Sequence, residues 1–65
     1  MKQETAREWA EKEIARDMAN REELIEERRE AWRRGDRRTY DALTRDIQEL
    51  YIGIKALREA YGVEE

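Results

Sequence analysis

The sequence predicts an all-α fold in which two helices pair antiparallel as a coiled-coil-like hairpin, and three observations carry this prediction. The second half holds seven apolar side chains at alternating steps of three and four residues, which places them along one stripe of an α-helix. The one strong break in the helical pattern is Gly35-Asp36. Apolar residues on either side of this break match in register. The seven side chains of the row are Tyr40, Leu43, Ile47, Leu50, Ile54, Leu57 and Tyr61.

The first helix is expected to run from about residue 6 to residue 34. Thr5 and Glu8 form a capping-box pattern, in which a Thr hydroxyl satisfies a free backbone N–H and a Glu follows three residues later. Arg21 and Arg28 lie between the apolar residues of the face that we expect to be buried. That face consists of Ala10, Ile14, Met18, Ile25 and Trp32.

A competing interpretation divides this first segment into two shorter helices near Asn20. The residues Asn20-Arg21-Glu22-Glu23 repeat the capping-box pattern, which is typical of a helix start. No Gly or Pro lies there to support a break. We therefore favour one continuous helix and keep the three-helix alternative open.

The turn and the second helix have clear signals at both ends. Gly35 suits the left-handed position that follows a helix, and Asp36 suits the N-cap of the next helix. The second helix is expected over residues 37–61, and Gly62 ends it. Residues 63–65 are expected to fray. The whole chain, residues 1–65, is then a single helical-hairpin domain.

The short turn fixes how the two helices pair. Helices joined by two residues must fold back antiparallel, so the numbers of facing residues should add to about 71 or 72 around this turn. Four apolar pairs meet this condition without adjustment. They are Trp32–Tyr40, Ile25–Ile47, Met18–Ile54 and Ile14–Leu57.

The chain is too short to bury a large core without help. Sixty-five residues bury only about 60% of their extended surface, and small domains usually add disulfides, a metal or a partner chain. This sequence has no Cys and no His, which excludes disulfides, zinc fingers and haem held by those residues. We therefore expect oligomerisation, most simply a homodimer that forms a four-helix bundle.

The two edges of the predicted hairpin differ in side-chain size. The first, which we call the small-residue edge, is mostly small or apolar and would allow a second hairpin to approach closely. It consists of Ala10, Asp17, Leu24 and Ala31 with Thr39, Asp46, Gly53 and Ala60. The other edge is mostly polar and is expected to face water. Its members are Glu8, Ala15, Glu22 and Arg29 with Thr44, Tyr51, Arg58 and Glu65.

The predicted core and dimer interface combine the central rows with the small-residue edge, and we expect Arg21 and Arg28 to find partners in Asp17 and Asp46. The interface residues are Ile14, Met18, Leu24, Ile25, Trp32, Tyr40, Leu43, Ile47, Leu50, Gly53, Ile54, Leu57, Ala60 and Tyr61. In length, single hairpin and short turn, this architecture resembles the Rop family. The resemblance implies a dimer of hairpins and binding of paired RNA loops through one face of the bundle, and no sequence motif accompanies it.

A dense group of arginines surrounds the predicted turn. Segment 28–38 holds six Arg against Glu30 and Asp36, a net charge of +4, so the remainder of this −3 chain carries −7. Arginine binds phosphate groups through paired hydrogen bonds, so the group is a candidate polyanion site. A solvated basic cap is the alternative interpretation. The candidate residues are Arg29, Arg33, Arg34, Arg37 and Arg38.

Several function classes lack the residues they need. Without Cys, His or Ser there is no usual pair of nucleophile and base, so we expect no enzyme activity, no metal and no cofactor. No apolar run is long enough to span a membrane, and a cytoplasmic location is expected. The sequence thus favours a small self-associating interaction or scaffold module. A de novo designed bundle is compatible with the same sequence features. The alternative is a Rop-like regulator that binds nucleic acid through the Arg-rich turn.

Overall fold

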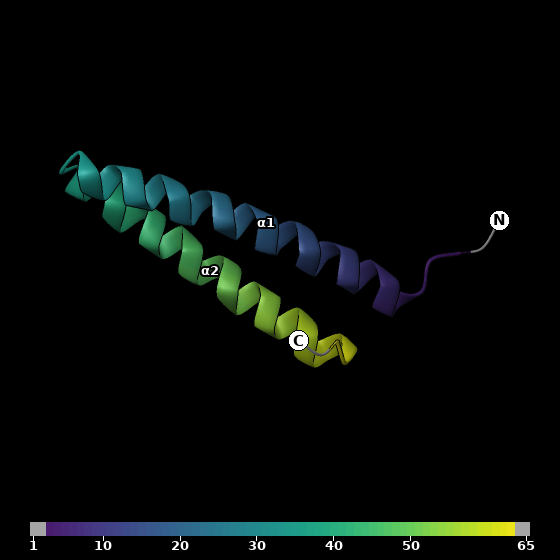
Figure 1. Cartoon of the computed structure of the whole chain (residues 1–65). Helices are drawn as coiled ribbons and strands as arrows, with labels where there is room; N and C mark the ends of the chain where they lie inside the picture. Colours follow the sequence, from purple (N-terminus) through teal and green to yellow (C-terminus); the bar gives the residue numbers. More distant parts are fainter. Residues whose placement is uncertain (1–2, 64–65) are drawn as a thin grey trace.

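The computed structural model describes residues 3–63 as two antiparallel helices, α1 (Ala6–Arg33) and α2 (Arg37–Tyr61), with no strand in that range. Figure 1 shows the two helices side by side, with the start of α1 and the end of α2 at the same end of the molecule. The molecule is elongated and measures 50 × 23 × 16 Å. The predicted all-α hairpin is confirmed. α1 continues through Asn20 without a break and ends one residue before the predicted boundary.

The start of α1 is capped as its sequence predicts. The Thr5 hydroxyl accepts a hydrogen bond of 3.1 Å from the backbone N–H of Glu8. The same hydroxyl donates to the Glu8 carboxylate, also over 3.1 Å. Two polar groups at the helix start are therefore satisfied locally, which stabilises the first turn.

The turn closes through a Schellman motif. Gly35 has a φ of +70°, the left-handed conformation that glycine adopts without a steric penalty. Its N–H donates to the Trp32 carbonyl over 3.1 Å, and the Asp36 N–H donates to the Ala31 carbonyl over 2.9 Å. Asp36 then caps α2, because its carboxylate accepts from the Thr39 N–H at 3.1 Å. The left-handed Gly35 and these three hydrogen bonds thus hold the end of α1 and the start of α2.

The end of α2 is also capped by a left-handed glycine. Gly62 has a φ of +64°, and the N–H of Val63 returns to the Arg58 carbonyl over 3.0 Å. Val63 is half-buried. The expected fraying is therefore wrong for Val63, and for Glu64 and Glu65 it lies outside the described residues.

Six apolar residues form the buried core of the hairpin, and they come equally from both helices. In α2 they follow the predicted row, whereas in α1 the two most covered residues are alanines with no exposed surface, Ala10 and Ala31. Met18 and Trp32, which we expected on the buried face of α1, are 45% and 67% exposed in the single hairpin. The buried residues are Ala10, Ile14, Ala31, Leu43, Ile47 and Ile54.

The buried face of α1 is therefore turned relative to the expected one. The least exposed row of α1 alternates steps of four and three through residues 10, 14, 17, 21, 24, 28 and 31. The row with Met18, Ile25 and Trp32 lies beside it on the helix surface. The physical reason is volume, because alanine at positions 10 and 31 lets both ends of α1 approach α2 more closely than Met or Trp would.

Candidate self-association surfaces

The turning of α1 places three of its large apolar residues on an edge that we had expected to be polar. We call this the Trp32 edge, and it consists of Met18, Ile25 and Trp32 of α1 with Thr44, Tyr51 and Arg58 of α2. The expectation of a solvated polar edge is thus wrong for the residues described. Trp32 is 67% exposed and Tyr51 is 55% exposed, while Ile25 is half-buried.

Contacts between the helices identify which residues share this edge. The Arg58 Nη2 atom lies 3.4 Å from the sulfur of Met18. At the other end, Trp32 packs on Tyr40 with ring centroids 5.3 Å apart, which confirms one of the four predicted pairs. The register of the Met18–Arg58 contact, moved by one heptad, brings Ile25 to the level of Tyr51.

Arg28 lies between the seam and the Trp32 edge. Its guanidinium sits over the ring of Tyr40, 5.5 Å from the centroid, and Nη1 donates to the Thr44 hydroxyl at 3.4 Å. A cation over an aromatic face is attracted to the negative face of the ring. Arg28 is therefore directed toward α2 and not toward solvent beyond the edge.

Arg21 occupies the equivalent position one heptad earlier and is less well satisfied. Its Nε atom is buried without a hydrogen-bond partner among residues 3–63, and Nη1 lies 4.0 Å from the Glu22 carboxylate. Asp17 and Asp46, the partners we expected for the two arginines, form no ion pair within the described chain. Pairing with a second copy stays a prediction.

The small-residue edge is hollow and acidic. One hollow of about 360 Å³ opens on it near the middle of the hairpin. Its lining contains three carboxylates and no cationic side chain, and it is completed by Gly53, whose missing Cβ would meet nothing within 4 Å. The lining residues are Asp17, Asn20, Leu24, Asp46, Glu49, Leu50 and Gly53. A second hollow, closer to the turn, adds Glu27, Glu30, Arg34, Thr39 and Leu43.

The arginines around the turn are mostly paired within the chain. Arg29 contacts Glu26 at 2.8 Å, and Arg33 contacts Glu30. Arg34 lies 3.9 Å from Asp36, and Arg37 lies 3.7 Å from Asp41. Arg38 forms no ion pair with any of residues 3–63. These pairs are exposed and therefore weak, so the arginines stay available to an outside anion.

Asp36 is the titratable group most affected by this turn. Its hydrogen bonds from the side chain and the backbone of Thr39 lower the pKa of the carboxyl below the usual 3.8, and the charges of Arg34 and Arg38 lower it further. The carboxylate therefore remains ionised and available as a helix cap at any pH above the ordinary range of aspartate.

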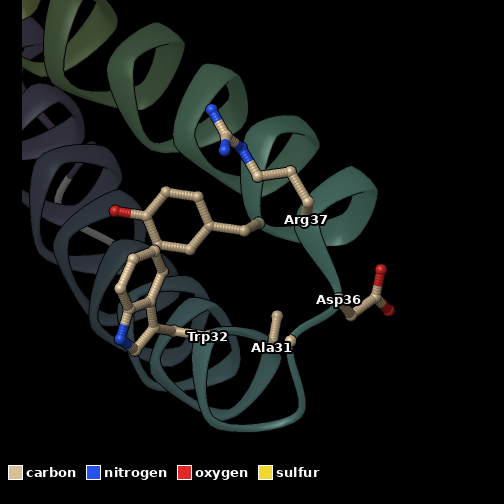
Figure 2. A pocket seen from close by; sticks show the side chains of 6 residues that line it. Ala31, Trp32, Asp36 and Arg37 are labelled. Carbon is tan, nitrogen blue, oxygen red and sulfur yellow. The ribbon is translucent and has the colours of Figure 1, made fainter.

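A shallow hollow of about 230 Å³ lies between the turn and the exposed ring of Trp32. Figure 2 shows Trp32 at the end of α1 and Arg37 at the start of α2 on either side of it, with the Asp36 carboxylate pointing away. The lining is completed by Ala31, Gly35 and Tyr40. An exposed indole next to arginines is a surface that favours flat or anionic groups.

The open end of the hairpin is closed by two aromatic rings. Trp9 and Tyr61 meet edge to face, with centroids 5.8 Å apart. Trp9 is 43% exposed, but its contact with Tyr61 joins the start of α1 to the end of α2. Lys12 reaches back to Glu4 over 3.0 Å, and this carboxylate raises the pKa of the lysine.

The structure divides the predicted interface residues among three environments. Ile14, Leu43, Ile47 and Ile54 are buried within the hairpin. Leu24, Ile25, Tyr40, Leu50 and Leu57 are half-buried, and Met18, Trp32, Gly53, Ala60 and Tyr61 are exposed. Sequence reasoning missed the combination of Met18, Ile25, Trp32 and Tyr51 as one exposed edge. The seven-residue spacing of the first three places them in one row, and only the packing of α1 on α2 shows that this row is an edge.

Among residues 3–63 no group of three or more acidic, Cys or His side chains is placed to hold a metal ion. Neither described helix is long and apolar enough to cross a membrane. Comparison with protein-family models, with curated proteins and with solved structures finds no match.

Proposed function

We propose that the chain is a non-enzymatic self-associating helical module, whose hairpin is completed by a second copy in a four-helix bundle. The observation that carries this proposal is the imbalance between a thin core and a large apolar surface. Four large side chains are buried in the hairpin, while Met18, Trp32 and Tyr51 leave about half or more of their surface exposed on one edge.

The total exposed area supports the same proposal. A compact monomer of 7.9 kDa exposes about 4,400 Å² by the usual scaling with mass. This chain exposes 5,500 Å². The excess of roughly 1,100 Å² exceeds the ~800 Å² that each partner buries in an interface of standard size. Its radius of gyration of 14.8 Å likewise exceeds the ~11 Å of a compact chain of this length.

Thermal unfolding at several chain concentrations tests the proposal. When folding and association are coupled, the unfolding midpoint rises with concentration by mass action. We expect the midpoint to rise by several degrees as the chain concentration increases 100-fold. A midpoint that is independent of concentration, with a fully helical starting state, would contradict self-association as the source of stability.

Nucleic-acid binding at the Arg-rich turn is the second candidate function, and the exposure of Trp32 beside this turn favours it. Arg37 is 84% exposed and lines the same hollow as Trp32. Aromatic rings flanked by arginine bind unpaired bases by stacking and phosphates by charge. The Rop-like resemblance also implies nucleic-acid binding, but through one face of the bundle, whereas this candidate uses the residues of the turn.

A gel-shift experiment with mixed RNA and DNA at low salt tests this second candidate. The matched variant carries Gln in place of Arg33, Arg34, Arg37 and Arg38. Affinity should fall with salt by about 0.9 log unit per contact for each tenfold increase, and it should be lost in the variant. Absence of binding by the parent chain would reject this function.

A further inference from the structure

We propose that the second copy docks on the Trp32 edge, with α1 packed antiparallel against α1 of its partner and a twofold axis beside Ile25. This inference rests on the proposed self-association and adds the surface and the orientation. It replaces the small-residue edge, which sequence reasoning favoured, with the opposite edge of the hairpin.

The first support is an apolar row of α1 that is complementary to the same row of a second copy running in the opposite direction. Met18, Ile25 and Trp32 are spaced by seven residues and so lie along one line of α1. A twofold axis at Ile25 brings Met18 of each copy to Trp32 of the other and Ile25 to itself. Thioether groups pack favourably against aromatic rings, and a twofold interface must be self-complementary in this way.

The second support is charge complementarity beside this row. Glu22 lies three residues before Ile25 and Arg29 lies four residues after it, so both flank the row on the same side. In the antiparallel pair, Glu22 of one copy then faces Arg29 of the other, twice per dimer. The present partner of Arg29 is Glu26, an exposed contact that costs little to exchange.

The inner flank of the row carries Arg21 and Arg28, which the same pairing brings toward each other. Their repulsion is limited by the direction of Arg28. Its guanidinium is held over Tyr40 and hydrogen-bonded to Thr44, a residue of the same edge, so it is directed along the edge toward α2 and not straight at α1 of the partner.

Charge along the whole hairpin also selects the antiparallel orientation. The turn segment 28–38 carries +4, and the remainder of the chain carries −7. An antiparallel copy places each basic turn against the acidic remainder of its partner, whereas a parallel copy would place two basic turns together. Opposite potentials across an interface favour association, and like potentials oppose it.

The small-residue edge is a poorer surface for a second copy. Its central hollow presents the carboxylates of Asp17, Asp46 and Glu49 without a cation in the lining. Two such surfaces would bring like charges together. None of the large exposed apolar residues Met18, Trp32 and Tyr51 would be covered there.

A charge-swap experiment tests the Glu22–Arg29 pairing. Glu22→Arg alone and Arg29→Glu alone each create two like-charge contacts per dimer, and we expect the dimer dissociation constant to rise about tenfold. An equimolar mixture of the two single variants should recover the parent affinity, because the mixed dimer has both pairs complementary. Glu23→Arg and Arg45→Glu change the net charge equally at exposed positions outside the row, and should leave the constant within about twofold.

Cysteine cross-linking tests the surface independently, because the parent chain has no Cys. Ile25→Cys places one thiol at the twofold axis and should form a covalent dimer under mild oxidation. Gly53→Cys on the small-residue edge and Ile52→Cys on the outer face should cross-link much more slowly. A dimer that forms its bond through Gly53→Cys and not through Ile25→Cys would overturn the inference and retain the proposed function. A folded monomer in which no variant cross-links would remove both.

Discussion

The two helices are similar in length and contribute to the core in different ways. α2 buries Leu43, Ile47 and Ile54 along one continuous apolar row. α1 buries Ile14 between two alanines, with Arg21 and Arg28 on the intervening turns of the seam. α2 therefore supplies most of the apolar volume, and α1 supplies close approach at its ends and long side-chain stems in its middle.

This difference explains why α1 is the helix with an unsatisfied surface. Its large apolar residues Met18, Ile25 and Trp32 lie beside the seam and cover α2 only in part, because Ala10, Ile14 and Ala31 occupy the buried positions. They form a second stripe on the same helix. A helix with two apolar stripes can pack on two sides, and we propose a second copy of the chain for the outer stripe.

The largest expected effect comes from removing an α2 core side chain. Ile54 is 4% exposed, so Ile54→Ala should lower the free energy of unfolding by about 2–5 kcal/mol. Ile52, two residues earlier, is 65% exposed, and Ile52→Ala should change it by less than about 0.5 kcal/mol. Chemical denaturation of both variants measures the difference. Equal losses would show that the described side of α2 is not the packed one.

A smaller effect is expected from enlarging the alanine at the closed end of α1. Ala31 has no exposed surface, so Ala31→Leu should force the helices apart and cost about 1–3 kcal/mol. Ala19→Leu, at an exposed position of the same helix, is the control and should be nearly neutral. If Ala31→Leu were stabilising, α1 would have to pack through Trp32 as first predicted.

Arg28 separates the role of a side-chain stem from the role of a charge. Arg28→Ala loses the contact with Tyr40, the hydrogen bond to Thr44 and the covering stem, and should cost about 1 kcal/mol. Arg28→Met retains a long apolar stem and should recover at least half of that loss. Chemical denaturation of the two variants measures their free energies of unfolding. Equal losses of stability would assign the whole effect to the guanidinium.

The smallest effect concerns the cap of α2 and depends on pH. The pKa of Asp36 is lowered in the folded state, so its contribution is fully present above the unfolded value near 3.8 and is lost as the pH falls through the lower folded value. The stability difference between the parent chain and Asp36→Asn should therefore shrink below pH 4. Thermal unfolding from pH 7 to pH 2 measures this, and a constant difference would contradict the cap.

The hairpin itself could be predicted, because its helix row, turn and caps are recognisable from short stretches of sequence. The row from Tyr40 to Tyr61 has no competitor in its helix, and Gly35 with Asp36 supplies both halves of the turn chemistry. The caps at Thr5 and Gly62 are of the same local kind. Such features depend on residues that are close in sequence, so they need no knowledge of packing.

The rotation of α1 could not be predicted in the same way. Three adjacent rows of α1 each contain apolar residues, and hydrophobicity alone ranks Trp32 above Ala31 as a core residue. The choice depends on how closely the short turn of residues 34–36 draws the helices together, which is a property of the assembled hairpin. The Trp32 edge, and with it the candidate site, follows from this choice.

The mass of the folded chain in solution tests the central claim most directly. Sedimentation equilibrium at micromolar concentration should give twice the chain mass of 7.9 kDa, with helical circular dichroism throughout. A well-folded, fully helical species at the mass of one chain would contradict the account, because the single hairpin would then be stable with Met18, Trp32 and Tyr51 left in water.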